Sequence, residues 1–156
     1  MDKKTKLGIS VGMISGLCYF LGFFSLISSP VLLASFVALA VVLISVDAVD
    51  AKKNATQATV FFSFIWFVQL ILGTVAGWID SFGLRLMDKG AENYNEVLIK
   101  IGSFVVTYNL FDGLKSLLTF VAFVFTVIFL IAVAKGKTPK IPVVTKKVDK
   151  AFNTAE

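Results

Sequence analysis

Four long apolar segments, separated by more polar stretches, constrain how this chain can fold. They cover residues 7–27, 31–46, 60–79 and 117–134, and none of them contains a charged residue. A helix that crosses a bilayer needs about 20 mainly apolar residues. We therefore predict an all-α integral membrane protein in which these segments form a four-helix transmembrane bundle over residues 1–135.

The composition supports lipid as the main solvent of the protein. Hydrophobic residues make up 57% of the 156 residues and charged residues 16%, whereas a soluble domain has about 45–50% apolar and about 25% charged residues. The net charge of +5 does not indicate nucleic-acid binding, because the lysines lie at segment ends and form no basic face on a soluble fold. We expect a multi-pass protein of the cell membrane, with the prokaryotic inner membrane as its location.

The first two apolar segments are joined by a very short connection. Ser29 is expected to cap the helix that Pro30 opens, since proline at the first helical position loses no needed N–H. The two segments then form a tight helical hairpin. A cleaved signal peptide is the alternative for residues 7–27, but this segment exceeds the usual apolar core of about 7–15 residues and the next apolar segment follows at once.

One sizeable region between the third and fourth segments does not span. Within residues 91–106, apolar residues recur at helical spacing: Tyr94, Val97, Leu98, Ile101 and Val105. This pattern predicts an amphipathic helix that lies in the membrane interface. A re-entrant segment or an additional short span over residues 97–111 is the alternative.

The basic residues predict the orientation. Cytoplasmic loops favour Lys and Arg. An inside N-terminus places Lys52, Lys53 and the lysines of both termini in the cytoplasm, and leaves four basic residues outside: Arg85, Lys89, Lys100 and Lys115. Residues 136–156 are then a basic cytoplasmic tail. We expect this tail to be mobile and held near anionic lipid headgroups; a short surface helix with Val144, Val148 and Phe152 on one face is the alternative.

Small residues mark two of the segments as helix-packing surfaces. Gly8, Gly12 and Gly16 recur at every fourth position of the first segment, and Gly73 and Gly77 do so in the third. Such patterns let helix backbones approach closely in lipid. They predict either a glycine zipper that assembles identical subunits into a pore or packing against a helix of the same chain.

Gln69 is the strongly polar residue in the middle of the third segment. An unpaired amide at that depth is costly, so we expect Gln69 to face another helix and to form an interhelical hydrogen bond.

The sequence offers little for catalysis. It contains no histidine and a single cysteine, Cys18, which removes the commonest general base and metal ligand and any disulfide framework. Phosphate-binding glycine loops and nucleophile motifs are missing as well. The paired carboxylates Asp47 and Asp50 are read as a helix terminus. We expect no enzyme, no cofactor and no metal.

The polar stretch VDAVDAKKNATQAT, residues 46–59, reads as a cytoplasmic turn. Asp47 and Asp50 are expected at the end of the second helix, where negative charge is locally unfavourable. Lys52 and Lys53 compensate for it. As this is the one charged cytoplasmic loop between helices in the predicted topology, these four residues are a candidate contact for a partner protein.

Asn54 or Thr56 is expected to cap the third helix, with Gln57 in its first turn. The Ala55-Thr56-Gln57-Ala58 element, together with the hairpin, the charged turn and the fourth helix, resembles a family of small four-helix bacterial membrane proteins of undefined function, related to the chloroplast inner-envelope protein-import component. Members often carry histidine where this chain has Asn54. The resemblance implies a membrane-embedded, non-enzymatic component near protein translocation or complex assembly.

These observations predict a non-catalytic integral membrane protein that acts as a partner or accessory subunit of a membrane transport or secretion assembly. The partner is another membrane protein or a second copy of the chain. The alternative is a small self-assembling channel or holin-like pore built on the Gly8, Gly12 and Gly16 stripe. An enzyme acting on lipid and a small transporter rank below both, since no span carries a central charge.

Overall fold

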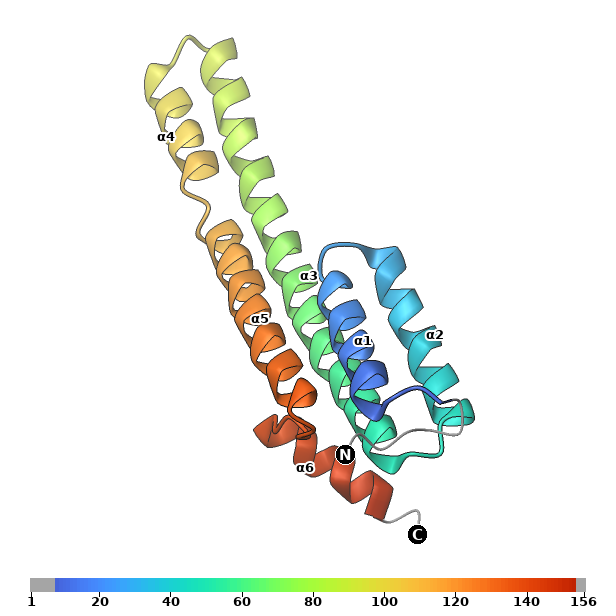
Figure 1. Ribbon diagram of the computed structural model, residues 1–156. Helices are drawn as coiled ribbons and strands as arrows, with labels where there is room; N and C mark the ends of the chain where they lie inside the picture. The colour runs from blue at the N-terminus through green and yellow to red at the C-terminus, as the bar shows by residue number, and fades with distance from the viewer. Residues whose placement is uncertain (1–7, 154–156) are drawn as a thin grey trace. The chain divides into compact units, whose positions relative to one another are not determined.

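The computed structural model describes residues 8–153, in which all regular structure is helical (Figure 1). The helices are α1 (Val11–Phe24), α2 (Ser29–Ser45), α3 (Val49–Glu92), α4 (Glu96–Thr107), α5 (Leu110–Ala134) and α6 (Pro142–Asn153). The predicted all-α class is confirmed.

Two helical stretches of the described chain are long and apolar enough to cross a membrane. They are Val49–Glu92 and Glu96–Ala134, the second of which contains both α4 and α5. Helices α1 and α2 are apolar but shorter, with 14 and 17 residues.

The chain divides into two compact units. The described part of the first unit holds residues 8–66 and 121–153, and the second holds residues 67–120. Helices α3 and α5 therefore each contribute to both units, while α1, α2 and α6 belong to the first and α4 to the second.

Helix α1 packs beside α2 as a hairpin, and each helix has a defined start (Figure 1). The Ser10 hydroxyl accepts from the Met13 N–H at 3.1 Å and caps α1. At α2 the N-cap is Ser28, with Ser29 already helical and Pro30 in the first turn. The expected cap was one residue too late.

Helix α3 begins at Val49, well before the span predicted to start at residue 60. Asn54, Thr56 and Gln57 thus lie inside the helix, so the predictions that the stretch is a turn and that Asn54 or Thr56 caps α3 were wrong. The physical reason is burial. A stripe at alternating four- and three-residue spacing continues from the apolar span into the polar stretch and is hidden in the first unit: Ala51, Ala55, Ala58, Phe62 and Ile65.

In the second unit, α3 and α4 form an antiparallel hairpin (Figure 1). Tyr94, with a φ of 51°, makes the turn, and the Asn95 side chain accepts from the Val97 and Leu98 N–H groups to cap α4. Helix α4 ends at Thr107, so it is close to the amphipathic helix predicted over 91–106 but begins later.

A short break separates α4 from α5, and Asn109 fixes it. Its Nδ2 donates to the Ala76 carbonyl at 3.0 Å and to Asp80 Oδ1 at 2.9 Å, while its Oδ1 accepts from the Phe111 N–H. Helix α5 then begins at Leu110, ahead of the span predicted from residue 117.

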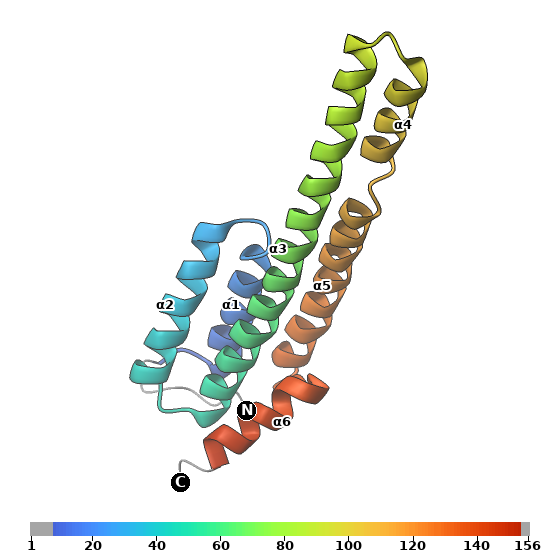
Figure 2. The same ribbon diagram turned by 180° about the vertical axis from the view of Figure 1, so that it is seen from behind.

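The basic tail contains helix α6, where we expected a mobile segment. Val148 is buried in the first unit, as is Ile141 just ahead of the helix. Figures 1 and 2 show α6 across the first turns of α3, next to the end of α5. The four-residue spacing of Val144, Val148 and Phe152, which we gave as the alternative, is the signal for this helix.

Candidate functional site

A cluster of polar side chains lies inside the first unit, and we call it the polar core. It consists of Ser15 and Tyr19 from α1 with Asn54 and Gln57 from α3. All four are buried, and Ser15, Tyr19 and Gln57 have no exposed surface. Asn54 and Gln57 lie beside the buried alanines at positions 51, 55 and 58 of α3.

Hydrogen bonds connect the polar core across the two helices. Asn54 Nδ2 donates to Ser15 Oγ at 3.0 Å, and the Tyr19 hydroxyl lies 3.5 Å from Gln57 Oε1, which is long for such a bond. Two amide atoms, Asn54 Oδ1 and Gln57 Nε2, have no hydrogen-bond partner within residues 8–153. The core therefore holds one acceptor and one donor that its own bonds do not use.

Aromatic rings seal the polar core on the side of α5. The rings of Tyr19 and Phe129 have centroids 5.2 Å apart, and Phe129 in turn contacts Phe61 and Phe125 at 5.7 and 5.8 Å. Tilted and edge-on contacts at these separations are favourable. The polar groups are neutral and enclosed, so the arrangement serves to hold helices in register.

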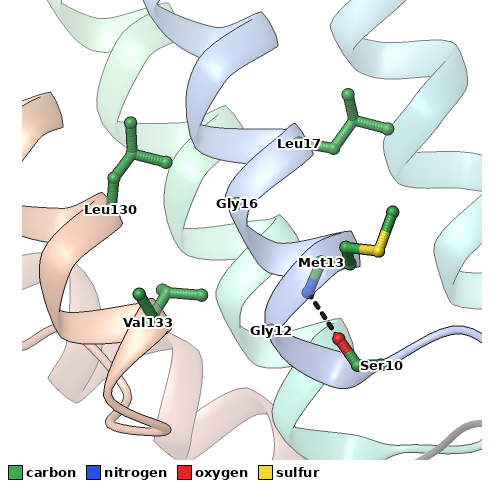
Figure 3. Close-up of a pocket in the computed structure, with 8 residues that line it drawn as sticks. Ser10, Gly12, Met13, Gly16, Leu17, Leu130 and Val133 are labelled. Carbon is green, nitrogen blue, oxygen red and sulfur yellow. Dashed lines mark hydrogen bonds between the residues drawn. The ribbon is translucent and has the colours of Figure 1, made fainter.

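The Gly8, Gly12 and Gly16 stripe is divided by the structure. A methyl group on Gly12 would lie 3.5 Å from the Val133 carbonyl oxygen, and one on Gly16 would lie 3.7 Å from Leu130 Cδ2. Both glycines thus face α5 of the same chain, at ordinary contact distance (Figure 3). Gly8 precedes the helix with a φ of +74° and has no neighbour within 4 Å of such a methyl group.

A groove of about 400 Å³ opens beside these glycines (Figure 3). It is bordered by Met13 and Leu17 of α1 and by Leu130 and Val133 of α5. Met13 and Leu17 are exposed, so this face of α1 offers both small and large apolar groups.

The predicted packing residues of the third segment lie in the second unit and differ in their surroundings. Gln69 is buried and its Nε2 donates to Thr119 Oγ1 of α5 at 2.7 Å. A methyl group on Gly73 would lie 3.6 Å from Lys115 Nζ, whereas a methyl group on Gly77 would have no neighbouring atom within 4 Å. Gln69 and Gly73 therefore face α5 and Gly77 does not.

The candidate partner contact lies where α2 gives way to α3. Asp47 and Asp50 are exposed, and Asp50 lies in the first turn of α3. Its negative charge is therefore at a helix N-terminus, where it is favourable, which corrects the expectation that it ends the second helix. Lys52 is half-buried, and Lys53 Nζ lies 3.2 Å from Asp149 Oδ1 of α6. Lys53 thus serves a contact within the chain.

The tightest glycine contacts with backbone atoms were not predicted. A methyl group on Gly102 would lie 2.5 Å from the Gly83 carbonyl oxygen and 2.9 Å from the Met87 nitrogen, and one on Gly90 would lie 2.8 Å from the Ile99 nitrogen. These glycines let α3 and α4 touch backbone to backbone. The seven-residue spacing from Gly83 to Gly90, which keeps both on one helix face, was the available signal.

Among residues 8–153 no group of three or more Cys, Asp or Glu side chains is arranged to hold a metal ion. The site is thus described by its neutral hydrogen bonds and its helix contacts. Comparison with known proteins gives no match to the chain, from family models, curated proteins or solved structures.

Proposed function

We propose that this chain is an integral membrane protein with lipid as the solvent of its outer surface. The distribution of side chains in the first unit supports this most directly. Gln57 and Ser15 have no exposed surface, while Met13 is 72% and Ile44 84% exposed. A soluble domain buries its apolar side chains and keeps amides outside, whereas in lipid the polar groups must find partners inside.

Four spans are proposed, formed by α1, α2 and the apolar parts of α3 and α5. Helices of 14 and 17 residues are about 21 and 26 Å long, somewhat less than the hydrocarbon core of about 30 Å. Local thinning of the bilayer accommodates such a deficit at modest cost. The lysine distribution supports cytoplasmic termini, with the α3–α4 hairpin outside.

The role we propose is that of a non-catalytic partner subunit in a membrane assembly. Its support is an apolar stripe on the outer face of α4 and its C-cap residue, made of Val97, Ile101, Phe104 and Tyr108. All four side chains are exposed, although Gly102 on another face of α4 is buried against α3. An exposed stripe at helical spacing fits a second apolar surface, either the membrane interface or a groove on another protein.

Co-purification in mild detergent tests this role, because a subunit should carry its partner through the purification. The wild-type chain should recover one other membrane protein in fixed proportion. An Ile101→Ser, Phe104→Ser double variant should lose it, whereas Tyr94→Ser, which changes an exposed aromatic residue in the α3–α4 turn, should keep it. The Asp47→Ala, Asp50→Ala double variant tests the second candidate contact in the same way. A wild-type chain that purifies without any partner contradicts the proposal.

A self-assembling pore is the second candidate, and the groove beside Gly12 and Gly16 favours it. The exposed Met13 and Leu17 that border this groove could meet the same face of a second copy. Pore formation predicts a homo-oligomer in detergent and leakage of solute from liposomes, both lost on Gly16→Leu. However, Gly12 and Gly16 already pack on α5, so Gly16→Leu is expected to disturb the monomer itself.

A further inference from the structure

An apolar groove runs between the first half of α3 and the basic helix α6. It has a volume of about 710 Å³, within the range of about 300–1,000 Å³ that small-molecule sites occupy. Val60 and Phe64 line it from α3, and Val143 and Val144 from α6. All four are apolar, and Val60, Phe64 and Val143 are exposed, so the groove suits a flexible hydrocarbon chain.

The groove has few polar groups, and the charged one among its lining residues is a lysine. Lys147 of α6 lines it and is exposed, so its ammonium group is free to meet an anionic group. Thr56 also lines it, and its hydroxyl oxygen has no hydrogen-bond partner within the described part of the chain. Asp149, the acidic residue of α6, is engaged by Lys53 at 3.2 Å. Positive charge therefore dominates beside the apolar surface.

We propose that this groove binds one acyl chain of an anionic phospholipid, with Lys147 contacting the phosphate. The inference rests on the proposed membrane location, in which α6 lies at the cytoplasmic surface where anionic headgroups are concentrated. The acyl chain lies against Val60, Phe64 and Val144. The bound lipid joins α6 to α3, beside the direct contacts of Val148 and of the Lys53–Asp149 pair.

The test uses full-length protein purified in detergent, with phosphatidylglycerol or phosphatidylcholine added and bound lipid counted by native mass spectrometry. One phosphatidylglycerol per chain should bind, in preference to phosphatidylcholine. Lys147→Gln should weaken this binding about fivefold, the factor for one basic residue at an anionic surface. Lys146→Gln, which removes the same charge from the neighbouring residue outside the groove, should change it less than about twofold.

A second pair of variants tests the apolar part of the site. Val60→Trp fills the groove from the α3 side and should abolish stoichiometric binding. Val41→Trp adds the same bulk on α2, where the side chain is exposed, and should not. Equal loss with Lys146→Gln and Lys147→Gln, or equal binding of both lipids, overturns the proposal. The proposal is also overturned if the protein resists alkaline extraction from membranes but binds no lipid. Release of the protein by alkali would instead contradict the membrane location.

Discussion

Ser15 and Asn54 show how single polar residues hold helices together where the surroundings are apolar. Their hydrogen bond joins α1 to α3 at 3.0 Å, and both side chains are buried. In lipid such bonds contribute about 0.6 to 2 kcal/mol each. Their larger effect is on register, because a shifted helix would leave a buried amide without a partner.

The first prediction concerns Ser15→Ala. This change removes the acceptor of Asn54 Nδ2 with almost no change in volume, and Asn54 Oδ1 already lacks a partner within residues 8–153. The whole buried amide then makes no bond, so the free energy of unfolding should fall by about 1 to 2 kcal/mol. Titration of detergent micelles with SDS, followed by circular dichroism, measures it.

Two comparisons make that measurement specific. Ser116→Ala changes an exposed serine of α5 and should stay within about 0.5 kcal/mol of wild type. Tyr19→Phe should cost less than Ser15→Ala, because its hydroxyl is 3.5 Å from Gln57 Oε1. Ser15→Ala behaving like Ser116→Ala would mean that the bond adds nothing to stability.

At the scale of the element, the α3–α4 hairpin depends on close approach of two backbones. We predict that Gly102→Ala lowers the free energy of unfolding by about 1 to 3 kcal/mol, because its methyl group would lie 2.5 Å from the Gly83 carbonyl oxygen. Hydrogen exchange of residues 80–107 should accelerate. Gly77→Ala is the matched control: its methyl group meets open space, and helix propensity favours alanine by about 1 kcal/mol. If both variants exchange alike, the hairpin is not packed in this way.

Docking of α6 gives a third prediction, decided by the size of two effects. Val148→Ser places a polar side chain in a buried position and removes about 1.5 to 3 kcal/mol of burial energy, so α6 should exchange its amide hydrogens much faster. Asp149→Ala breaks the ion pair between Lys53 and Asp149. The Asp149 side chain is 46% exposed, and ion pairs at such positions contribute about 0 to 1 kcal/mol. Asp149→Ala should therefore leave hydrogen exchange in α6 nearly unchanged. Faster exchange in Asp149→Ala than in Val148→Ser would make charge the main docking force.

The elements differ in how far the sequence determines them. Each apolar segment could be identified as helical from composition alone, whereas the start of α3 could not be, because Asp47 to Asn54 read as a polar turn. The stripe from Ala51 to Ile65 was visible in the sequence, but only the packing of the first unit shows that it is buried. The polar core pairs residues 38 and 39 positions apart, and no local pattern reveals such partners.

At the scale of the whole molecule, buried polar groups and exposed apolar side chains together argue for insertion in a bilayer. In the first unit Ser15, Asn54 and Gln57 are buried, while large apolar side chains such as Met13 and Ile44 are exposed. The proposed topology leaves two surfaces with distinct chemistry outside the proposed spans: the apolar stripe of α4 and the basic helix α6. If the proposed topology holds, these two surfaces lie on opposite sides of the membrane, so that a partner on one side and lipid on the other can be bound at once.

The last prediction tests that arrangement through single-cysteine variants. Cys18 is the single cysteine of the sequence and is buried. A Cys18→Ala background therefore has no thiol for the maleimide to label. Lys89→Cys of α3 and Lys146→Cys of α6 both replace exposed side chains. With a maleimide that does not cross membranes, intact cells should label only Lys89→Cys, and inside-out vesicles only Lys146→Cys, because lysines concentrate on the cytoplasmic side. Labelling of both from the same side would require an even number of spans between them and would overturn the four-span topology. Labelling in the inverted pattern would keep the spans and reverse the orientation.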